Sequence, residues 1–571
     1  MKTGQVYTPP KLADLITQLT FVGKLNELKN SLIQDKVNNQ RFNQILKDFK
    51  DFSMLDPACG EGIFLTSAYK YLKREFTELL EKKQLEGSKK TIIRDFAENI
   101  QYRLYGVDID KLAVDKARNN LHNECNIFSS ALSQQIQVVN FLDKSIANVF
   151  QRWNKPRFQF IIGNPPFIDI LNLKNAQKAR LRSNFKSLSK RFDIYIPFLE
   201  QAINFLEPNG TIAFILPSSI LYESYAGKIR KLILEKLNIK CIFDLSKFNL
   251  FPVAVRTLCL ILEQRKENPV NHKVKILQPS IHPLQNIEFS SKQFFIPQIF
   301  FNGTYDYQFR LVEEKIREIG EKILSRSIKL GTILVTAWGA RGTPIKDFHF
   351  NDPINNKCRR LVKGEDIITS PFPHVRYQNR WLLYDRARLY RPSLPSLFTQ
   401  KKIVIRKVTG SAGLIAALDN EFFYTDDSVI CGVLKNQLVH IPISELGRHK
   451  IVCTKEDIAL SRSYSLESIL ALLNSDVGQF YFNNFLSHKL NVYPKLVEEF
   501  PVPLVKKQSS FIQDLSHQVH LLLGAVDDTD RKTKDLIQIK KQINKLVLSK
   551  YDFSDVQKQI IQQYQSPSSP E

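Results

Sequence analysis

Between residues 51 and 265, short apolar runs alternate with stretches of helical periodicity. Apolar runs of roughly four to eight residues predict buried strands, and longer stretches of helical spacing predict helices. The strand-like runs are FSMLDPACG, YRLYGVDID, IQVVNFLD, FQFIIGNPPF and GTIAFILP. Strands that alternate with helices form βαβ units on a mostly parallel sheet. The sequence therefore predicts an α/β fold for this part of the chain.

The chain has 571 residues, too many for one ordinary domain. We assign residues 1–265 to a first domain, and we interpret the polar, proline-rich stretch 266–300 as a linker. Residues 301–505 combine short β-like runs with many Arg, Lys and aromatic residues, which predicts a second domain of mixed α+β type. Residues 506–571 return to helical spacing before a polar tail, so we expect a C-terminal helical segment.

The formal net charge is +24, and hydrophobic residues make up 43% of the chain. A polyanionic partner is the favoured interpretation of this charge, because Lys and Arg neutralise phosphates and release counterions. A basic but merely solvated surface is the alternative. No apolar run approaches the roughly 18 residues that predict a membrane span, and the first residues carry no apolar signal-peptide core. Seven cysteines occur singly, which favours reduced thiols in a cytosol over disulfides or a metal site.

Two glycines directly follow the first strand-like run, in LDPACGEGIF. Gly60 and Gly62 stand between a strand and a helix, where glycine lets the backbone turn sharply and approach a ligand. Asp108 ends the next run, YGVDID, where a carboxylate can accept hydrogen bonds from ribose hydroxyls. The Gly-x-Gly-x-x-Gly and Gly-Lys-Ser/Thr phosphate motifs are absent. We therefore expect a nucleoside ligand without a bound phosphate, rather than NAD or ATP.

A further strand end carries IIGNPPF, residues 161–167. Two prolines cannot continue a helix and donate nothing to a central sheet ladder, so a stiff turn begins here. Asn164 then lies at the carboxyl edge of the sheet, where ligands bind in open α/β folds.

The glycine loop, the acidic strand end and Asn-Pro-Pro-Phe, in this order, resemble S-adenosylmethionine-dependent amino-methyltransferases. Further blocks in sequence order resemble the gamma class of N6-adenine DNA methyltransferases, of which the TaqI enzyme is an example. These blocks are GQVYTPPKLADLI, DIYIPFLEQAI, IAFILPSSIL and NLFPVAVRTLCLIL. The resemblance covers residues 4–265 and implies a Rossmann-like, S-adenosylmethionine-dependent methyltransferase domain of restriction–modification type.

The resemblance assigns a set of residues to the cofactor. They are Thr8, Asp56, Ala58, Cys59, Gly60, Gly62, Asp108, Ile109, Asn140, Phe141 and Phe198. Thr8 would contact the methionine carboxylate, Asp56 its ammonium group, and Asp108 the ribose. The family commonly has Asp-Phe where this chain has Asn140-Phe141, and an Asn still offers a carbonyl acceptor to the adenine amino group.

The resemblance places the chemistry at Asn164, Pro165, Pro166, Phe167 and Phe251. The oxygen of Asn164 and the carbonyl of Pro165 would accept the amino hydrogens of adenine and so free its conjugated lone pair. Phe167 and Phe251 would stack on the base, which must first leave the duplex. Direct methyl transfer needs no metal. We interpret Cys59 as a packing residue, and the absence of any Pro-Cys dipeptide excludes the cytosine C5 route.

Residues 301–505 resemble, more loosely, the target-recognition domain of the same family. Basic residues alternate with aromatic ones there, which suits contacts to double-stranded DNA. The candidates for such contacts are Arg341, Lys346, Arg406 and Lys407. The resemblance also implies a prokaryotic cytosolic location. Two types stay open: a restriction–modification enzyme with a separate restriction endonuclease acting on the same site, and an orphan methyltransferase without one. Monomer and homodimer both stay open, and we expect no fused nuclease.

Two alternatives remain from the sequence. An RNA adenine or a protein glutamine amide could replace DNA adenine, since enzymes for both use Asn-Pro-Pro-aromatic sites. A non-catalytic DNA-binding subunit is the other reading, which the intact Asn164-Pro165-Pro166-Phe167 disfavours.

Overall fold

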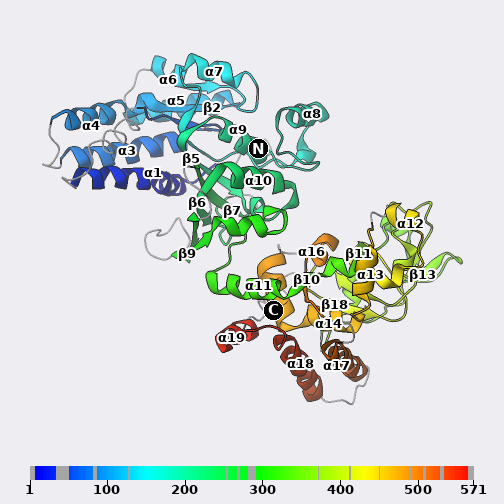
Figure 1. The fold of residues 1–571 in the computed structure, drawn as a ribbon. Helices are drawn as coiled ribbons and strands as arrows, with labels where there is room; N and C mark the ends of the chain where they lie inside the picture. The colour runs from blue at the N-terminus through cyan, green and yellow to red at the C-terminus, as the bar shows by residue number, and fades with distance from the viewer. Residues whose placement is uncertain are drawn as a thin grey trace. The chain divides into compact units, whose positions relative to one another are not determined.

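The computed structural model describes a defined set of residues. They are 7–33, 51–81, 87–125, 129–251, 255–265, 271–280, 291–370, 372–409, 413–448, 451–487, 491–505, 509–526 and 533–563. The chain divides into two compact units, residues 1–313 and 314–571 (Figure 1). Residues 4–6 of the Thr-Pro block and the polar tail from 564 lie outside the described residues. No helix among the described residues is both long and apolar enough to cross a membrane.

Unit 1 is built on one large sheet, which in the described residues has nine strands in the order β3-β2-β1-β4-β5-β7-β6-β8-β9. The strands are β1 (Met54–Asp56), β2 (Leu104–Asp108), β3 (Ile136–Val138), β4 (Phe158–Gly163), β5 (Leu206–Pro217), β6 (Leu237–Asp244), β7 (Thr257–Gln264), β8 (Lys273–Pro279) and β9 (Ser291–Pro297). Neighbours from β3 to β5 are parallel, β7 runs antiparallel to β5 and β6, and β9 runs antiparallel to β8. The α/β fold with a mostly parallel sheet, predicted from the sequence, is confirmed.

Helices cover both faces of this sheet (Figure 1). They are α1 (Pro10–Ile33), α3 (Ile63–Leu80), α4 (Gly87–Asn99), α5 (Lys111–Cys125), α6 (Ser129–Gln135), α7 (Ile146–Arg152), α8 (Asn175–Asn184), α9 (Tyr195–Asn204) and α10 (Gly227–Lys236). Side chains alternate between the faces along each strand. Phe160 and Ile162 therefore join the core with α1, α3, α4 and α5, whereas Ile161 joins the core with α7, α9 and α10.

The first domain extends further than the sequence indicated. Residues 266–300 were interpreted as a linker, but β8 and β9 lie in this range and widen the sheet beyond β6. Ile276 of β8 and Ile296 of β9 are fully buried in the core of unit 1. The boundary between the units falls at residues 313 and 314 instead. Polar and proline-rich sequence flanks these two short strands, so their periodicity does not stand out in the sequence.

Unit 2 contains several small sheets, of which the largest have the orders β11-β20-β17-β18 and β12-β16-β13-β19. Its strands are β10 (Ser327–Lys329), β11 (Leu334–Trp338), β12 (His349–Phe350), β13 (Cys358–Val362), β14 (Ile367–Ile368), β15 (His374–Val375), β16 (Trp381–Leu383), β17 (Lys402–Arg406), β18 (Ala416–Asp419), β19 (Tyr424–Thr425), β20 (Val429–Leu434) and β21 (Pro501–Pro503). Its helices are α11 (Glu314–Ser325), α12 (Ile443–Arg448), α13 (Lys455–Ser461), α14 (Leu466–Asn474), α15 (Asp476–Tyr481), α16 (Pro494–Glu498), α17 (Ser510–Val526), α18 (Thr533–Leu548) and α19 (Asp555–Gln563). The mixed α+β composition agrees with the prediction.

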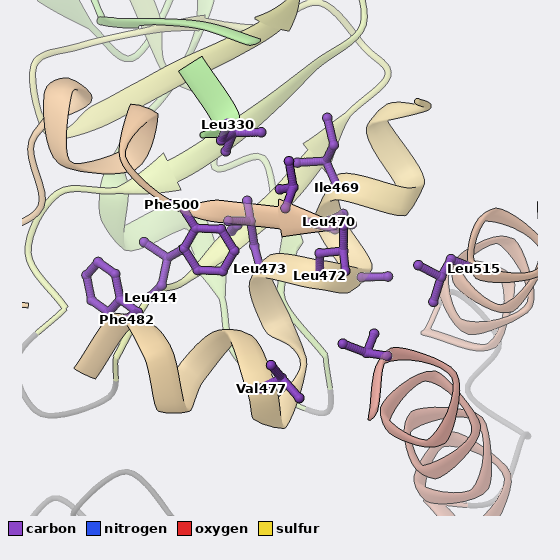
Figure 2. Packing of buried hydrophobic residues seen from close by; sticks show 14 of the residues in the cluster. Leu330, Leu414, Ile469, Leu470, Leu472, Leu473, Val477, Phe482, Phe500 and Leu515 are labelled. Atoms are coloured by element: carbon purple, nitrogen blue, oxygen red, sulfur yellow. The ribbon is translucent and has the colours of Figure 1, made fainter. Parts of the chain in front are cut away.

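The C-terminal helices belong to the core of unit 2 and are not a separate segment. Leu515 of α17 packs in one apolar cluster with Leu472 and Val477 of the preceding helices, as Figure 2 shows. Ile543 of α18 and Ile561 of α19 are buried in the same cluster. The helices predicted for residues 506–571 are present, and their apolar stripes are covered by α14 and α15.

A fully buried ion pair lies in the central sheet of unit 2. Lys402 of β17 contacts Asp419 of β18, and both side chains are 0% exposed. Asp419 also accepts the backbone N–H groups of Glu421 (2.9 Å) and Phe423 (3.0 Å), and Lys402 donates to the carbonyl of Phe398 at 3.2 Å. Every charge in this group therefore has partners, which a buried ion pair requires.

Replacing Lys402 by Met should destabilise unit 2 by about 3–5 kcal/mol, because the carboxylate of Asp419 stays buried without its cation. Unfolding in guanidinium chloride, followed by the fluorescence of Trp338 and Trp381 in a Trp153→Phe background, measures this. Lys495→Ala on α16, also in unit 2, is the control, since it breaks a pair in which Lys495 is 77% exposed and should cost less than about 1 kcal/mol. A Lys402→Met variant as stable as that control would contradict the expectation.

Candidate active site and cationic cluster

The glycine loop after β1 is tied to the end of β2. Gly60 and Gly62 have φ angles of 51° and 82°, which residues other than glycine rarely adopt. The N–H of Gly60 donates to Oδ2 of Asp108 at 2.9 Å, and that of Cys59 donates to the carbonyl of Val107 at 3.0 Å. The loop and the acidic strand end, noted separately in the sequence, thus form one structure.

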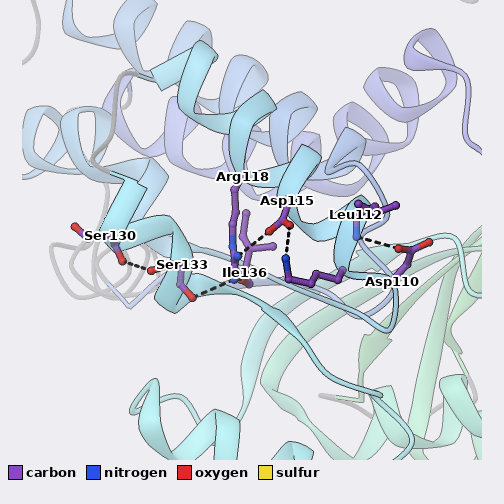
Figure 3. Close-up of polar contacts among 8 residues, drawn as sticks. Asp110, Leu112, Asp115, Arg118, Ser130, Ser133 and Ile136 are labelled. Atoms are coloured by element: carbon purple, nitrogen blue, oxygen red, sulfur yellow. Dashed lines mark hydrogen bonds and ion pairs between the residues drawn. The ribbon is translucent and has the colours of Figure 1, made fainter.

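Helix α5 fixes the turn that carries Asp108. Oδ1 of Asp108 accepts the N–H of Asp110 at 2.9 Å, and Oδ1 of Asp110 accepts that of Leu112 at 2.9 Å, which starts the helix. Farther along the same helix, Arg118 donates twice to the carbonyl of Ile136 in β3 (Nε 3.0 Å, Nη2 2.6 Å) and once to Asp115 at 3.1 Å (Figure 3). Helix α5 is therefore anchored both to the end of β2 and to the first residue of β3.

A cavity of about 300 Å³ opens beside these strand ends. Its size lies at the lower end of the range for small-molecule sites, which begins at roughly 300 Å³. The predicted residues that line it are Ala58, Gly60, Asp108, Ile109, Asn140, Phe141, Asn164, Pro165, Pro166 and Phe198. Phe198 closes one wall together with Phe141, their ring centroids being 5.4 Å apart. Residues from four strand ends and from α9 therefore meet at one hollow.

A second cavity, of about 580 Å³, adjoins the first and shares Tyr7, Ala58, Gly60 and Asn164 with it. Thr8, Asp56 and Cys59 line this second cavity. Gly62 lines neither cavity, and it packs against Ala117 of α5 so closely that a Cβ would lie 3.0 Å from the Cβ of that residue. Its role is to join loop and helix.

Asp56 is the most strongly perturbed carboxyl group of the site. It is 1% exposed, and its Oδ1 accepts the N–H of Ala58 at 3.1 Å, while Oδ2 has no hydrogen-bond partner among the described residues. Burial raises its pKa well above the usual range, and the neighbouring charge of Asp108 raises it further. A Cβ on Gly163 would lie 2.7 Å from Oδ1, so only glycine at the end of β4 leaves room for this carboxylate. The carboxyl group of Asp56 is therefore suited to bind a cation.

Asn164 follows β4 and is held from both sides. Its Nδ2 donates to Oγ1 of Thr8 at 3.2 Å, which connects the Thr-Pro block with the Asn-Pro-Pro turn. Behind the turn, the N–H of Ile168 donates to Asp193 at 3.0 Å, and the N–H of Ile194 donates to the carbonyl of Ile168 at 3.0 Å. Burial raises the pKa of Asp193 to about 6. Asp193 was not among the predicted residues, although it begins the DIYIPF block.

Phe167 and Phe251 lie together but not as parallel plates. Their ring centroids are 6.5 Å apart at an interplanar angle of 89°, an edge-to-face contact. Phe251 is 6% exposed and belongs to the core of unit 1. Neither ring lines the two cavities, so a base stacked on both faces requires one ring to turn.

Sequence reasoning missed several residues of the first cavity. They are Tyr7, Pro57, Ala113, Val139, Leu142, Ile168, Leu173, Gln177, Arg180, Leu181 and Ile194. Leu173, Gln177, Arg180 and Leu181 come from the segment around α8, which no motif marks. Its only signal in the sequence is a run of positive charge.

In unit 2, the structure brings together only part of the predicted DNA-contact set. Arg341 and Lys407 both face Asp427, at 3.6 and 3.9 Å. Arg406 is the last residue of β17, and Lys407 directly follows the strand; Arg406 is not part of the group around Asp427. Lys346 is exposed in the short turn Ile345–Asp347.

A further arginine completes the group around Asp427, which we name the cationic cluster: Arg341, Arg391, Lys407, Asp427 and Trp338. Arg391 lies 4.0 Å from Asp427, and its guanidinium group lies 5.8 Å from the ring centroid of Trp338. The ammonium group of Lys407 lies 5.0 Å from the same ring. Three cations thus share one carboxylate, which leaves two positive charges at a partly exposed surface.

Residues 102–251 match the family model of the Eco57I restriction-modification methylase. Among curated relatives, the Type II methyltransferase M.BstVI of Geobacillus stearothermophilus is 24% identical over 253 residues, 43% of this chain and 39% of that protein. The restriction enzyme and methyltransferase RM.Eco57I of Escherichia coli is 22% identical over 316 residues, 49% of this chain and 31% of that protein. The resemblance to restriction–modification methyltransferases is confirmed.

Two other similarities bear on fold and substrate. The solved structure of the Type IIL restriction-modification enzyme MmeI in complex with DNA has a TM-score of 0.58 and 14% identity, covering 98% of this chain and 79% of that one. This likeness shows the fold. A tRNA1(Val) (adenine(37)-N6)-methyltransferase of Pseudoalteromonas atlantica is 28% identical over 120 residues, 21% of this chain and 41% of that protein. Each of these three curated matches spans less than half of the relative.

Replacing Asp56 by Asn should stabilise the ligand-free protein by about 0.5–2 kcal/mol at pH 7, the range typical of removing a functional strain. Because the pKa of Asp56 is raised in the folded state, its ionisation works against folding, and this penalty develops as the pH rises above the ordinary Asp value of 3.8. Urea unfolding of both proteins between pH 4 and 8 measures it. The gain should shrink toward zero at the acidic end; an equal gain at every pH would contradict the electrostatic cause.

Proposed function

We propose that this chain transfers a methyl group from S-adenosylmethionine to the exocyclic N6 of an adenine in a specific double-stranded DNA sequence, as a gamma-class enzyme would. The observation that supports it best is that Asn164 and Pro165 line the same cavity as the glycine loop and Asp108. An amino-group acceptor pair thereby adjoins a nucleoside-type site. The match to the restriction-modification methylase model supports DNA as the substrate.

The residues present fit S-adenosylmethionine. The buried oxygen of Asp56 that lacks a partner suits the methionine ammonium group, and Thr8 lies in the same cavity for the carboxylate. Asp108 is positioned for the ribose hydroxyls, and Asn140 offers an amide at the wall that would face the adenine ring. Bound there, the cofactor supplies an electrophilic methyl group on a sulfonium centre.

The chain's own residues prepare the nucleophile. The side-chain oxygen of Asn164 and the carbonyl of Pro165 each accept a hydrogen bond from the amino group of adenine. These two hydrogen bonds draw the nitrogen lone pair out of conjugation with the ring. Pro165 and Pro166 keep these acceptors rigid, so little reorganisation accompanies the reaction. The hydrogen bond that Nδ2 of Asn164 donates to Oγ1 of Thr8 orients the amide for this contact. Positioning of the two reactants then provides much of the rate.

The adenine has to leave the duplex before it can reach this cavity, which costs a few kcal/mol of lost stacking and pairing. Phe167, next to the Asn-Pro-Pro turn, would stack on the extruded base after its ring turns out of the edge-to-face contact with Phe251. The cationic cluster of unit 2 supports contacts to the DNA backbone, because partly exposed Arg and Lys groups beside aromatic rings suit phosphate and base-edge contacts.

An RNA adenine is the second candidate substrate, favoured by the similarity to the tRNA1(Val) methyltransferase. That similarity covers 120 residues and no more than 21% of this chain. Transfer of a tritiated methyl group to duplex DNA, tRNA and total protein, followed by separation of the modified nucleosides, distinguishes the candidates. Label in N6-methyladenine from duplex DNA is the expected result.

Asn164→Ala should lower the methyl-transfer rate by about 10²–10³-fold, the loss typical of removing one preorganised polar group. Affinity for DNA and for the cofactor should stay within about twofold, since neither depends on the amino-group contact. Single-turnover transfer and fluorescence anisotropy measure the two quantities. Asn119→Ala, at an exposed position of α5 outside both cavities, is the matched control and should transfer as the unchanged protein does. Turnover by Asn164→Ala within tenfold of that control would refute the assignment.

Substitutions in the cationic cluster should change the affinity for DNA in opposite directions, depending on whether a cation or Asp427 is replaced. Arg341→Gln with Lys407→Gln should weaken DNA binding and lower the slope of log K against log salt by about 2, since each phosphate contact contributes about 0.9. Asp427→Asn should strengthen binding at low salt, because it removes the one negative charge among three cations. Anisotropy titrations between 50 and 300 mM salt measure both, with Lys315→Gln on α11 as the control. Equal effects of all three variants would contradict a specific role.

A further inference from the structure

A strongly basic segment directly follows the Asn-Pro-Pro-Phe turn. Residues 170–191, which we name the basic arm, contain seven Lys and Arg residues and no Asp or Glu. They are Lys174, Lys178, Arg180, Arg182, Lys186, Lys190 and Arg191. None of the roles derived above for binding the cofactor or for methyl transfer requires this charge.

Helix α8, at the centre of the basic arm, is not held by an apolar face. Leu181 is its one buried residue, and Figure 1 shows the helix standing apart from those that cover the sheet. A helix that is polar on nearly all sides gains little from core packing, so other contacts must fix it. One such contact is the ion pair between Arg180 and Asp143 at 2.6 Å.

Both ends of the basic arm are fastened to unit 1. At its start, the N–H of Ile170 donates to the carbonyl of Phe192 at 3.1 Å. After α8, the carboxylate of Glu200 accepts the N–H groups of Lys186 (3.0 Å) and Ser187 (2.9 Å). Lys228 of α10 donates to the carbonyl of Leu188 at 3.0 Å. The arm is therefore a preorganised surface.

Four lysines of the arm present charge that the protein does not neutralise. Arg180 pairs with Asp143 and Arg191 with Asp169, and Arg182 donates to the carbonyl of Lys190. The remaining four form no ion pair within the part of the chain that the structure describes. Three of them are exposed and Lys178 is half-buried: Lys174, Lys178, Lys186 and Lys190. This charge lies beside the reacting groups, because Leu173, Gln177, Arg180 and Leu181 of the same arm line the cavity that contains Asn164.

We propose that the basic arm is a DNA-backbone contact on the catalytic unit, separate from the cationic cluster, in which the four lysines bind phosphates flanking the extruded nucleotide. The inference rests on the proposed function and adds to it the element that holds the DNA at the catalytic cavity. Fixed cations there neutralise phosphates next to the base that leaves the stack, and such contacts release counterions. Since they touch no base, they carry no sequence information.

Replacing all four lysines by Gln tests this. The salt slope of duplex binding should fall by about 3 to 4, at about 0.9 per phosphate, and affinity at 150 mM salt should fall at least tenfold. The loss should be the same for cognate and unrelated duplexes. Binding of S-adenosylhomocysteine without DNA and the midpoint of urea unfolding should stay as in the unchanged protein, which separates lost contacts from misfolding.

Two controls match this variant. Arg at the same four positions keeps the charge and should retain the affinity and the salt slope. Gln at Lys315, Lys540, Lys541 and Lys545, exposed lysines on α11 and α18, removes the same total charge elsewhere and should lower the slope by less than 1. If this distant variant loses as much as the arm variant, the effect is one of net charge and the inference is overturned.

The inference and the proposed function fail in different ways. If the protein methylates DNA adenine but the arm variant binds duplex DNA with unchanged affinity and salt slope, the DNA-contact role of the basic arm is refuted and the proposed function is not. Methyl label in tRNA or protein and none in duplex DNA refutes the proposed substrate, whatever the arm does. Loss of the salt slope with tRNA but not with duplex would assign the arm to RNA and overturn it as a DNA contact.

Discussion

Parallel pairing of β1 with both β2 and β4 is the constraint on which the site depends. Met54 lies level with Leu104 on one side and with Phe160 on the other, so the three strands end at the same edge. Residues that are about 50 and 100 positions apart in the chain thereby meet within one hollow. The hydrogen bond from Gly60 to Asp108 closes this edge between β1 and β2, and the absence of a side chain on Gly163 leaves room for Asp56 beside β4. Without this register, the motifs would be unrelated loops.

The electrostatics at this edge of the sheet favour the binding of a cation. Asp56 is buried close to Asp108, and both effects raise its pKa. Such an arrangement is unfavourable until a positive group arrives, which is the general reason that perturbed carboxyl groups gather at functional sites. Asp193 stands in a similar position behind the Asn-Pro-Pro turn, where it accepts backbone N–H groups. The charge of the surface has the opposite sign, with cations on the basic arm and in the cationic cluster.

Much of the fold could be predicted because it rests on local patterns. The five strand-like runs contain β1 to β5, and helices lie between these strands as the alternating pattern predicts. Short strands within polar sequence could not be predicted in this way. Residues 266–300 were interpreted as a linker because the periodicity of β8 and β9 is too brief to stand out. The wall formed by Leu173, Gln177, Arg180 and Leu181 escaped for another reason. Nothing in a run of basic residues says which way its few apolar side chains will turn.

The sequence by itself determined the strand ends, the residue types at them and the excess of positive charge, because these follow from periodicity and composition along the chain. Only the tertiary structure decided that Thr8 reaches Asn164, that Asp427 gathers Arg341, Arg391 and Lys407, and that Phe251 meets Phe167 edge-on. These contacts join segments far apart in the sequence, and their geometry depends on how whole elements pack. Packing is a collective property of the core, which no single segment encodes.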